Sequence, residues 1–212
     1  MFFKKKSLNK DEQAGAPSVT KELKSSEINA QSLAQCELSG GTALVLAFIS
    51  PHCNFSEVNR MLKNAMPFAK QIIGIMTAGE LGANESRLYH DTPSTWDRVI
   101  VHAFSAKMFS NVSVHIVSLF NQDPRTHDSL HAQSEQRVEK IVSEIKKIKV
   151  PFDIDSRDTV ALTYFDGISG CEDFFTQAVY RSKQFPCYFI GGSAGGKLDF
   201  ANAPVADRCC LP

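Results

Sequence analysis

The amino-acid sequence predicts an α/β domain with a mixed sheet, flanking helices and a disordered N-terminal tail. Three observations support this fold class. Short apolar runs of strand length recur along the chain, segments with helical spacing of apolar residues lie between them, and glycine-rich loops join the two. Taken in order, the segments give the element order β-α-β-β-β-α-β-α-β. At 212 residues and 43% hydrophobic content, the chain is long enough to bury a substantial core.

The first segment differs in composition from the remainder of the chain. Residues 1–38 are rich in Lys, Ser, Gln, Glu and Asn, and they show no sustained apolar period. A segment of this composition has too little apolar surface to offset the entropy of ordering its backbone. The sequence therefore predicts a flexible tail over residues 1–38 and a folded domain over residues 39–212.

The folded domain is predicted to begin with a β-α-β unit. Residues 42–49 form a continuous apolar run, which is typical of a strand buried on both faces. Asn54 and Glu57 have the spacing of a helix capping box, and apolar residues follow at helical spacing. Residues 71–76 form a second apolar run, so we expect two parallel strands joined by a right-handed crossover.

The second half of the chain continues with alternating strands and helices. The predicted elements are strands at 97–104 and 112–119, a helix from near Asp128 to just before Pro151, a strand at 159–165, a helix that begins at the capping-box pair Ser169 and Glu172, and a last strand at 187–190. The short link between the first two strands predicts an antiparallel hairpin. The chain ends without an element that would protect the sheet edge, so we expect the domain to continue past Pro212.

Charge and cysteine usage limit the possible partners and the compartment. The 23 basic residues balance the 23 acidic residues, so no net field favours nucleic acid or an anionic membrane. No apolar run reaches the length of a membrane span, and the protein is predicted to be cytoplasmic. The cysteines lack the paired spacing of a zinc site, which predicts reduced thiols at Cys36, Cys53, Cys171, Cys187, Cys209 and Cys210.

Four loops of small and polar residues follow the strands of the parallel-type units. In α/β sheets, ligands bind beyond the carboxyl ends of the strands, where such loops converge. The four loops cover residues 50–54, 77–80, 166–170 and 191–196. They predict a single ligand pocket, although glycine and aspartate also occur in turns for backbone reasons alone.

The same loops carry a resemblance to a known family. The segments IGIMTAGEL at residues 73–81, FDGISGCE at 165–172 and IGGSAGG at 190–196 resemble, in order, three signature segments of the FIST domain. The resemblance spans about Ala43 to Phe200. Met76 stands where the first signature has Ser, and Gly196 stands where the last has Asp, so a ligand contact from these two side chains is not expected.

The resemblance implies a function as well as a fold. It implies a bacterial signal-input domain that binds a small molecule, such as an amino acid or a small metabolite, and does not catalyse a reaction. Residues 39–212 would then be an N-terminal FIST half that is truncated at its C-terminal side. A companion C-terminal half would supply the opposite wall of the pocket, and an output module such as a chemoreceptor or histidine kinase would follow.

The predicted ligand contacts come from the four loops. Polar contacts are expected from His52, Thr77, Glu80, Asp166 and Ser193, with Ala78 beside them, and close backbone approach is expected at Gly79, Gly167, Gly191, Gly192 and Gly195. No cofactor is predicted outright. Because some FIST proteins are haem-binding nitric oxide sensors, the resemblance also allows haem, with His52 or His90 as the iron ligand. A hydrogen bond within a turn is the alternative role for either histidine.

Two enzyme classes are alternatives to a sensor. Residues 191–197 satisfy most of a phosphate-binding loop pattern, but Leu198 replaces the Ser or Thr that would hold Mg²⁺. The adjacent His52 and Cys53 lie before a helix start, where a thiol can be activated, although no third orienting residue is evident. Asp166 and Glu80 could form an acid/base pair if their loops converge. Ligand binding is the interpretation that these residues favour.

Overall fold

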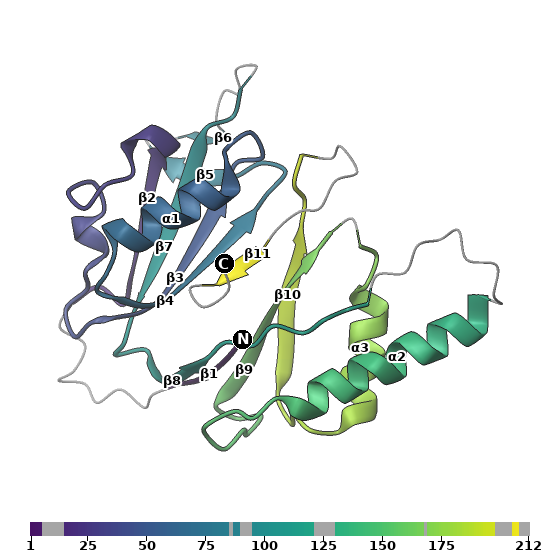
Figure 1. The fold of residues 1–212 in the computed structure, drawn as a ribbon. Helices are drawn as coiled ribbons and strands as arrows, with labels where there is room; N and C mark the ends of the chain where they lie inside the picture. The colour runs from purple at the N-terminus through teal and green to yellow at the C-terminus, as the bar shows by residue number, and fades with distance from the viewer. Residues whose placement is uncertain are drawn as a thin grey trace.

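The chain folds into an α/β structure with two mixed sheets, which confirms the predicted fold class (Figure 1). The computed structural model describes residues 1–5, 15–84, 87–89, 95–120, 130–167, 169–197 and 205–207. Its helices are α1 (Phe55–Ala65), α2 (Leu130–Lys147) and α3 (Glu172–Ser182). Its strands are β1 (Phe2–Lys5), β2 (Ser18–Lys24), β3 (Thr42–Ile49), β4 (Ala69–Met76), β5 (Leu81–Asn84), β6 (Arg87–Tyr89), β7 (Arg98–Ser105), β8 (Phe109–Ser113), β9 (Thr159–Asp166), β10 (Tyr188–Ala194) and β11 (Val205–Asp207).

The two larger sheets are named here after one strand of each. The β3 sheet has the strand order β11-β4-β3-β7-β2, and the β9 sheet has the order β10-β9-β1-β8. Strands β5 and β6 form a separate two-stranded hairpin. Both large sheets contain one parallel pair, β3 with β4 and β9 with β10, and their remaining pairs are antiparallel.

The predicted β-α-β unit is present as β3, α1 and β4. The two strands are parallel, with Leu46 opposite Ile73 in the register. Asn54 is the N-cap of α1, and its side chain accepts a hydrogen bond from the backbone N–H of Glu57 at 3.2 Å, as the capping spacing predicts. Gly74 of β4 allows α1 to approach, because a Cβ there would lie 2.1 Å from the Asn59 side chain.

Alternation along the strands of the β3 sheet builds two cores. On β3, Val45 and Ala47 pack in the cluster that contains α1, whereas Leu44 and Leu46 pack in a second cluster together with Leu162 of β9. The two faces of β3 are therefore covered by a helix and by another sheet, respectively. The layers run in the order α1, β3 sheet, β9 sheet and the α2–α3 pair (Figure 1).

The described part of residues 1–38 differs from the tail that the sequence predicts. β1 is an inner strand of the β9 sheet, between β8 and β9, and β2 pairs with β7 at the edge of the β3 sheet. Leu23, Ile28, Leu33 and Cys36 are buried in the core beside α1. Each of these segments is too short to show a period, and its strand partners lie far away along the chain. Residues 6–14 lie outside the described residues.

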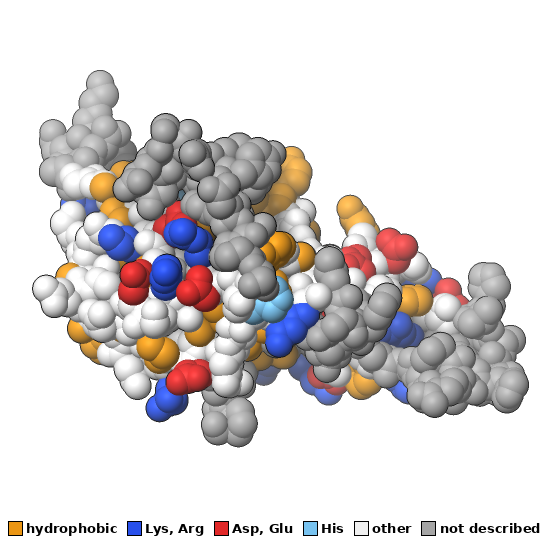
Figure 2. Space-filling model, turned by 90° about the horizontal axis from the view of Figure 1, so that it is seen from above, with side chains coloured by type: hydrophobic (Ala, Val, Ile, Leu, Met, Phe, Trp, Pro, Cys, Tyr) orange, Lys and Arg blue, Asp and Glu red, His pale blue; other side chains and the backbone are white. Residues whose placement is uncertain are grey.

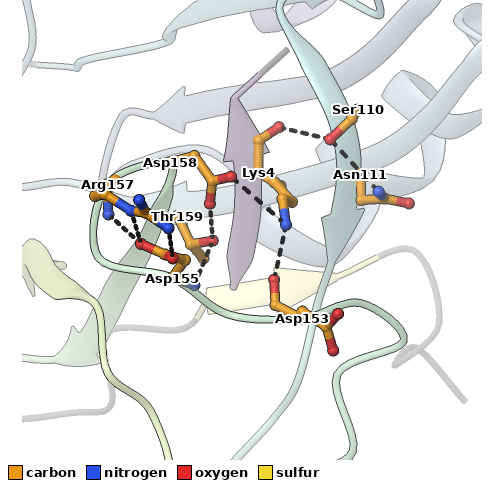
Figure 3. A network of polar contacts seen from close by, with 8 residues as sticks. All are labelled: Lys4, Ser110, Asn111, Asp153, Asp155, Arg157, Asp158 and Thr159. Carbon is orange, nitrogen blue, oxygen red and sulfur yellow. Dashed lines mark hydrogen bonds and ion pairs between the residues drawn. The ribbon is translucent and has the colours of Figure 1, made fainter. Parts of the chain in front are cut away.

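A polar network fixes β1 in the β9 sheet (Figure 3). The Lys4 ammonium donates to the carbonyl of Asp153 at 3.1 Å and forms an ion pair with Asp158 at 3.5 Å. On the other side, Ser110 of β8 donates to the Lys4 carbonyl at 3.3 Å. Nearby, the guanidinium of Arg157 holds the pKa of Asp155 far below its ordinary value. A strand of four residues is thus held by polar contacts from both neighbours.

The predicted hairpin of residues 97–104 and 112–119 is wrong. β7 belongs to the β3 sheet, whereas β8 belongs to the β9 sheet and pairs with β1. The short turn between them carries the chain from one sheet to the other. Residues 114–119 are not a strand, and Val117 and Leu119 pack against α2 and α3 instead. A short apolar run does not specify its strand partner, so the sequence pattern could not distinguish a hairpin from a crossover.

The start of α3 also differs from its predicted capping box. The N-cap residue is Cys171, and Ser169 instead donates its hydroxyl to the carbonyl of Asp166 at 2.5 Å. The buried Cys171 sulfur accepts a hydrogen bond from Arg137 of α2 at 2.6 Å. The guanidinium carbon of Arg137 also lies 4.5 Å from the ring centroid of Phe174. Contacts with α2 therefore position the beginning of α3 in place of a local cap.

Candidate functional site

The loops that follow β3 and β4 contact each other directly. The backbone N–H of Thr77 donates to the carbonyl of Ile49 at 2.9 Å. The Glu80 carboxylate accepts hydrogen bonds from the hydroxyls of Thr77 and Ser50, the latter at 2.8 Å. Three of the polar residues in these two predicted loops thus form one cluster, in which both carboxylate oxygens of Glu80 bind neighbouring side chains.

The loops of the β9 sheet meet the loops of the β3 sheet at the carboxyl ends of the parallel strands (Figure 1). A Cβ at Gly195 would lie 2.5 Å from the Cβ of Ala78, so these two residues are in close contact. The backbone N–H of Gly167 donates to the carbonyl of Ala194 at 3.0 Å. Ala194 itself is buried in the cluster between the sheets. The predicted convergence of the four loops is therefore seen as a chain of contacts.

The glycines of these loops mostly allow close packing within the protein. A Cβ at Gly167 would lie 2.5 Å from the Ala194 carbonyl, and one at Gly191 would lie 1.8 Å from the Thr163 carbonyl. A Cβ at Gly79 would approach the Trp96 ring to 3.2 Å. Gly192 differs, because a Cβ added there would meet no atom within 4 Å. Sequence alone does not distinguish glycine that admits a ligand from glycine that admits another strand.

His52 contacts Trp96 at the end of this loop cluster. The backbone N–H of Trp96 donates to Nδ1 of His52 at 3.1 Å, and the two rings meet edge to face with centroids 5.9 Å apart. The neighbouring Cys53 is buried, and burial raises the pKa of its thiol, with the charges of Asp97 and Glu80 adding to the rise. An activated thiolate requires the opposite shift.

A pocket of about 550 Å³ lies beside α3, along the outer edge of the β9 sheet. Its volume is in the range of small-molecule sites, which is roughly 300 to 1,000 Å³. The described residues that line it come from the carboxyl-terminal half of β9, from α3, from β10 and from the connection between α3 and β10: Thr163, Phe165, Glu172, Phe175, Thr176, Val179, Tyr180, Lys183, Phe185, Pro186, Cys187, Tyr188, Phe189, Ile190, Gly191, Gly192 and Ser193.

Helix periodicity provides one wall of the pocket. The residues of α3 that line it recur at helical spacing and therefore lie on one face of the helix: Glu172, Phe175, Thr176, Val179 and Tyr180. The other wall is β10, where Gly191 lies beside Thr163 of β9 in the parallel register. Because Gly191 has no side chain, the backbone forms this part of the wall.

The two ends of the pocket differ in charge. Glu172 lies in the first turn of α3, and its carboxylate accepts a hydrogen bond from the hydroxyl of Ser193. Lys183 lies at the other end, as the C-cap of α3, with a positive φ of 51°. Between them the wall is aromatic, and the ring centroids of Phe175 and Phe189 lie 6.4 Å apart in an edge-to-face arrangement. The pocket can hold a molecule that has an apolar body and polar groups at its ends.

Few of the predicted site residues line this pocket. Gly191, Gly192 and Ser193 do, whereas the described part of its lining contains none of His52, Thr77, Ala78, Gly79, Glu80, Asp166, Gly167 and Gly195. The aromatic residues of the lining were missed as site residues. Phe175 and Val179 belong to the apolar stripe of α3, and such a stripe gives the same sequence signal whether it meets a core or a pocket.

The residues named in the enzyme alternatives make contacts within the protein. Gly191–Ala194 belong to β10, so their amides lie in a strand and do not form a phosphate-binding loop. His52 is held by Trp96, and the Cys53 thiol is buried. Glu80 accepts from Ser50 and Thr77. These contacts are the ones expected of structural groups.

At His52, the described residues do not fit the haem that the family resemblance allows as an alternative. His52 is exposed, its Nδ1 accepts from Trp96, and it does not line the apolar pocket. His90 lies outside the described residues, as do Cys209 and Cys210. Within the described residues, no group of three His, Cys, Asp or Glu side chains could hold a metal ion. The cysteines that the structure describes, Cys36, Cys53, Cys171 and Cys187, are not joined in disulfide bonds.

Charged side chains of both signs are mixed on the surface. Figure 2 shows basic and acidic side chains interspersed on one face of the molecule, without a large patch of one sign among the residues that are described. In the part of the chain that the structure describes, no helix is long and apolar enough to span a membrane.

Comparison with known proteins gives one match. The family model described as FIST N domain matches residues 43–210. No curated protein and no solved structure matches the chain. The matched range begins at the second residue of β3 and extends past β11, so it covers the four predicted loops and the pocket beside α3.

Proposed function

The chain belongs to the FIST N domain family, a family of sensory rather than catalytic domains in signal-transduction proteins, and we propose that its input is a small molecule bound in the pocket beside α3. The observation that carries this proposal is the pocket of about 550 Å³ inside the matched region. Its wall includes Gly191, Gly192 and Ser193, which belong to the third signature segment of the family resemblance.

The chemistry of the lining supports a ligand with an apolar, planar body. Phe175 and Phe189 offer ring faces and edges for such a body. Glu172 and Ser193 together offer a carboxylate and a hydroxyl for an amine or another donor group. Amino acids and small metabolites with these groups are the ligand class that we propose.

The contacts of β10 support a route from the pocket to the remainder of the domain. The strand forms a wall of the pocket, and its end at Ala194 is buried between the two sheets. The next residue, Gly195, packs on Ala78 in the loop after β4. A ligand that prefers one position of β10 would therefore shift the population of arrangements at the junction of the sheets.

The remaining parts of the function follow from the family. We propose that the domain acts in the bacterial cytoplasm, that a companion FIST half completes it, and that a chemoreceptor or histidine kinase module receives the signal. In this arrangement, a shift of β10 at the pocket would first reach the β3 sheet through the contact between Gly195 and Ala78.

A thermal-shift screen with a pocket-filling variant tests the proposal. The probes are the twenty amino acids and a set of aromatic and aliphatic metabolic acids and amines. A compound that binds should raise the free energy of unfolding of the wild-type chain by about 2.7 kcal/mol when its concentration is 100 times its dissociation constant. In Thr176→Trp, an indole would occupy the pocket from α3, and the shift should disappear.

Gln177→Trp is the matched control. Gln177 is the next residue on α3, is exposed, and does not line the pocket. The control variant should keep the wild-type shift. If no probe shifts the melting temperature, or if Thr176→Trp responds as the wild type does, the pocket is not the sensory site.

A further inference from the structure

Exposed apolar side chains are concentrated beside the pocket. Of the large hydrophobic residues that the described chain exposes, Tyr180 is 78% exposed, Tyr188 69% and Ile190 56%. The remaining one, Ile116, is 63% exposed and does not line the pocket. Clustered exposed hydrophobic residues mark interaction surfaces more often than scattered ones do. We name this surface the β10 rim, defined as strand β10 together with Thr176 and Tyr180 of α3 and its C-cap Lys183.

The β10 rim also contains a sheet edge. β10 is the terminal strand of the β9 sheet, and within the described chain only β9 pairs with it (Figure 1). Five of its seven residues are exposed. A terminal strand with exposed apolar side chains offers backbone donors and acceptors for another strand, and native proteins usually cover or charge such an edge. In β10 every residue is uncharged.

Charge placement indicates which kind of partner fits. Glu172 and Lys183 lie at opposite ends of the pocket-facing side of α3. A second α3 that lies antiparallel to the first would bring Lys183 of each copy toward Glu172 of the other. A parallel arrangement would bring like charges together, which is unfavourable. The chain has no formal net charge, so two copies do not repel each other as wholes.

The sequence of β10 is complementary to itself in the antiparallel direction. If two copies pair around Gly191, Tyr188 lies opposite Ala194, and Ile190 lies opposite Gly192. Each large side chain then meets a small one on the same face of the sheet. One two-fold axis perpendicular to the sheet reverses both β10 and α3, so the strand pairing and the charge pairing require the same axis.

From these observations we propose that the β10 rim binds the β10 rim of a second copy, forming a two-fold dimer in which the β9 sheets join into one continuous sheet. The partner would cover the apolar side chains of the rim and close the open side of the pocket. The dimer itself requires no ligand, so its existence can be tested independently of the sensory role.

The test is the oligomeric state of the whole chain. Light scattering after size-exclusion chromatography should be measured at protein concentrations between about 1 and 200 µM. The molar mass should rise from that of one copy to that of two as the concentration increases. Ile190→Lys places a charge on the rim and should raise the dissociation constant at least about tenfold. Ile116→Lys is the matched control, because Ile116 has similar exposure outside the rim, and it should leave the dissociation constant unchanged.

Charge exchange tests the orientation of the two copies. Lys183→Glu should weaken the dimer, and adding Glu172→Lys to it should restore the dimer, because the exchanged charges again meet across the axis. Tyr180→Glu serves as a second rim variant if Ile190→Lys does not fold, as judged by circular dichroism. A monomer at 200 µM, a dimer that tolerates both rim variants, or a failure of the charge exchange to restore it would overturn the proposal.

Discussion

Strands β3 and β10 show how differently two parallel strands of one chain can be used. Every residue of β3 except Phe48 is buried, because α1 covers one face and the β9 sheet covers the other. On β10 only Ala194 is buried, although this strand also pairs in parallel with its neighbour. The position of a strand in its sheet, rather than the type of pairing, therefore determines which side chains reach the surface.

The same contrast extends to the layers around the two strands. The cluster around α1 contains Leu33, Val45 and Leu62 at no measurable exposure, whereas in the cluster of α2 and α3 half-buried aromatic residues surround a smaller buried group. The β3 half therefore has the properties of a closed scaffold. The β10 half, with its pocket and exposed edge, has the properties of a binding surface.

The largest expected effect compares truncation of a side chain on each strand. Leu44→Ala removes a residue of β3 that is 1% exposed and should lower the free energy of unfolding by about 2 to 5 kcal/mol. Ile190→Ala on β10 should change it by less than about 0.5 kcal/mol at low protein concentration. Urea denaturation measures both values. Similar losses in the two variants would show that β10 is as well packed as β3.

A smaller effect is expected at the contact between the two halves. Gly195→Ala would place a Cβ 2.5 Å from the Cβ of Ala78 and should cost about 1 to 3 kcal/mol, because the loops of the two sheets must separate. Gly192→Ala is the matched control on β10, since its added Cβ would meet no atom within 4 Å. Thermal unfolding compares the two variants. Equal melting temperatures would contradict a close contact between Gly195 and Ala78.

The smallest effect concerns pH, with one histidine near each sheet. Burial lowers the pKa of His102 on β7 and of His115 after β8 below the ordinary value of 6.5. As the pH falls below about 6.5, the unfolded chain binds protons that the folded chain does not, so the free energy of unfolding should decline. Above 6.5 this stabilisation is fully present. Denaturation measured between pH 7.5 and 5.5 should show a smaller decline in the free energy of unfolding for His102→Gln and for His115→Gln. Each substitution removes at most one proton from the number taken up on unfolding.

Local patterns predicted the elements well where a segment determines its own structure. The apolar run at residues 42–49 and the capping spacing of Asn54 and Glu57 correctly predicted β3 and α1, because burial on both faces and a helix cap are local signals. The pairing partners of the strands were harder to predict from the sequence. β7 and β8 join different sheets, and nothing in their own residues specifies that outcome.

The site was predicted less completely than the fold. The loops of the resemblance converge as expected, but the contacts seen there are between Ala78 and Gly195 and around Glu80, within the protein itself. The pocket is formed by α3 and the edge of β10. Its aromatic lining depends on which face of α3 remains uncovered, and that follows from tertiary packing, which a sequence period does not reveal.

The inner position of β1 has a consequence for how the molecule is made. Phe2–Lys5 pairs with residues 109–113 and 159–161, so more than 150 further residues must be synthesised after this segment before its sheet can close. Contacts of such separation slow folding, whereas β3, α1 and β4 can associate early. During synthesis the apolar pair Phe2 and Phe3 therefore remains without its native partners, and the nascent chain is most prone to aggregate in this interval.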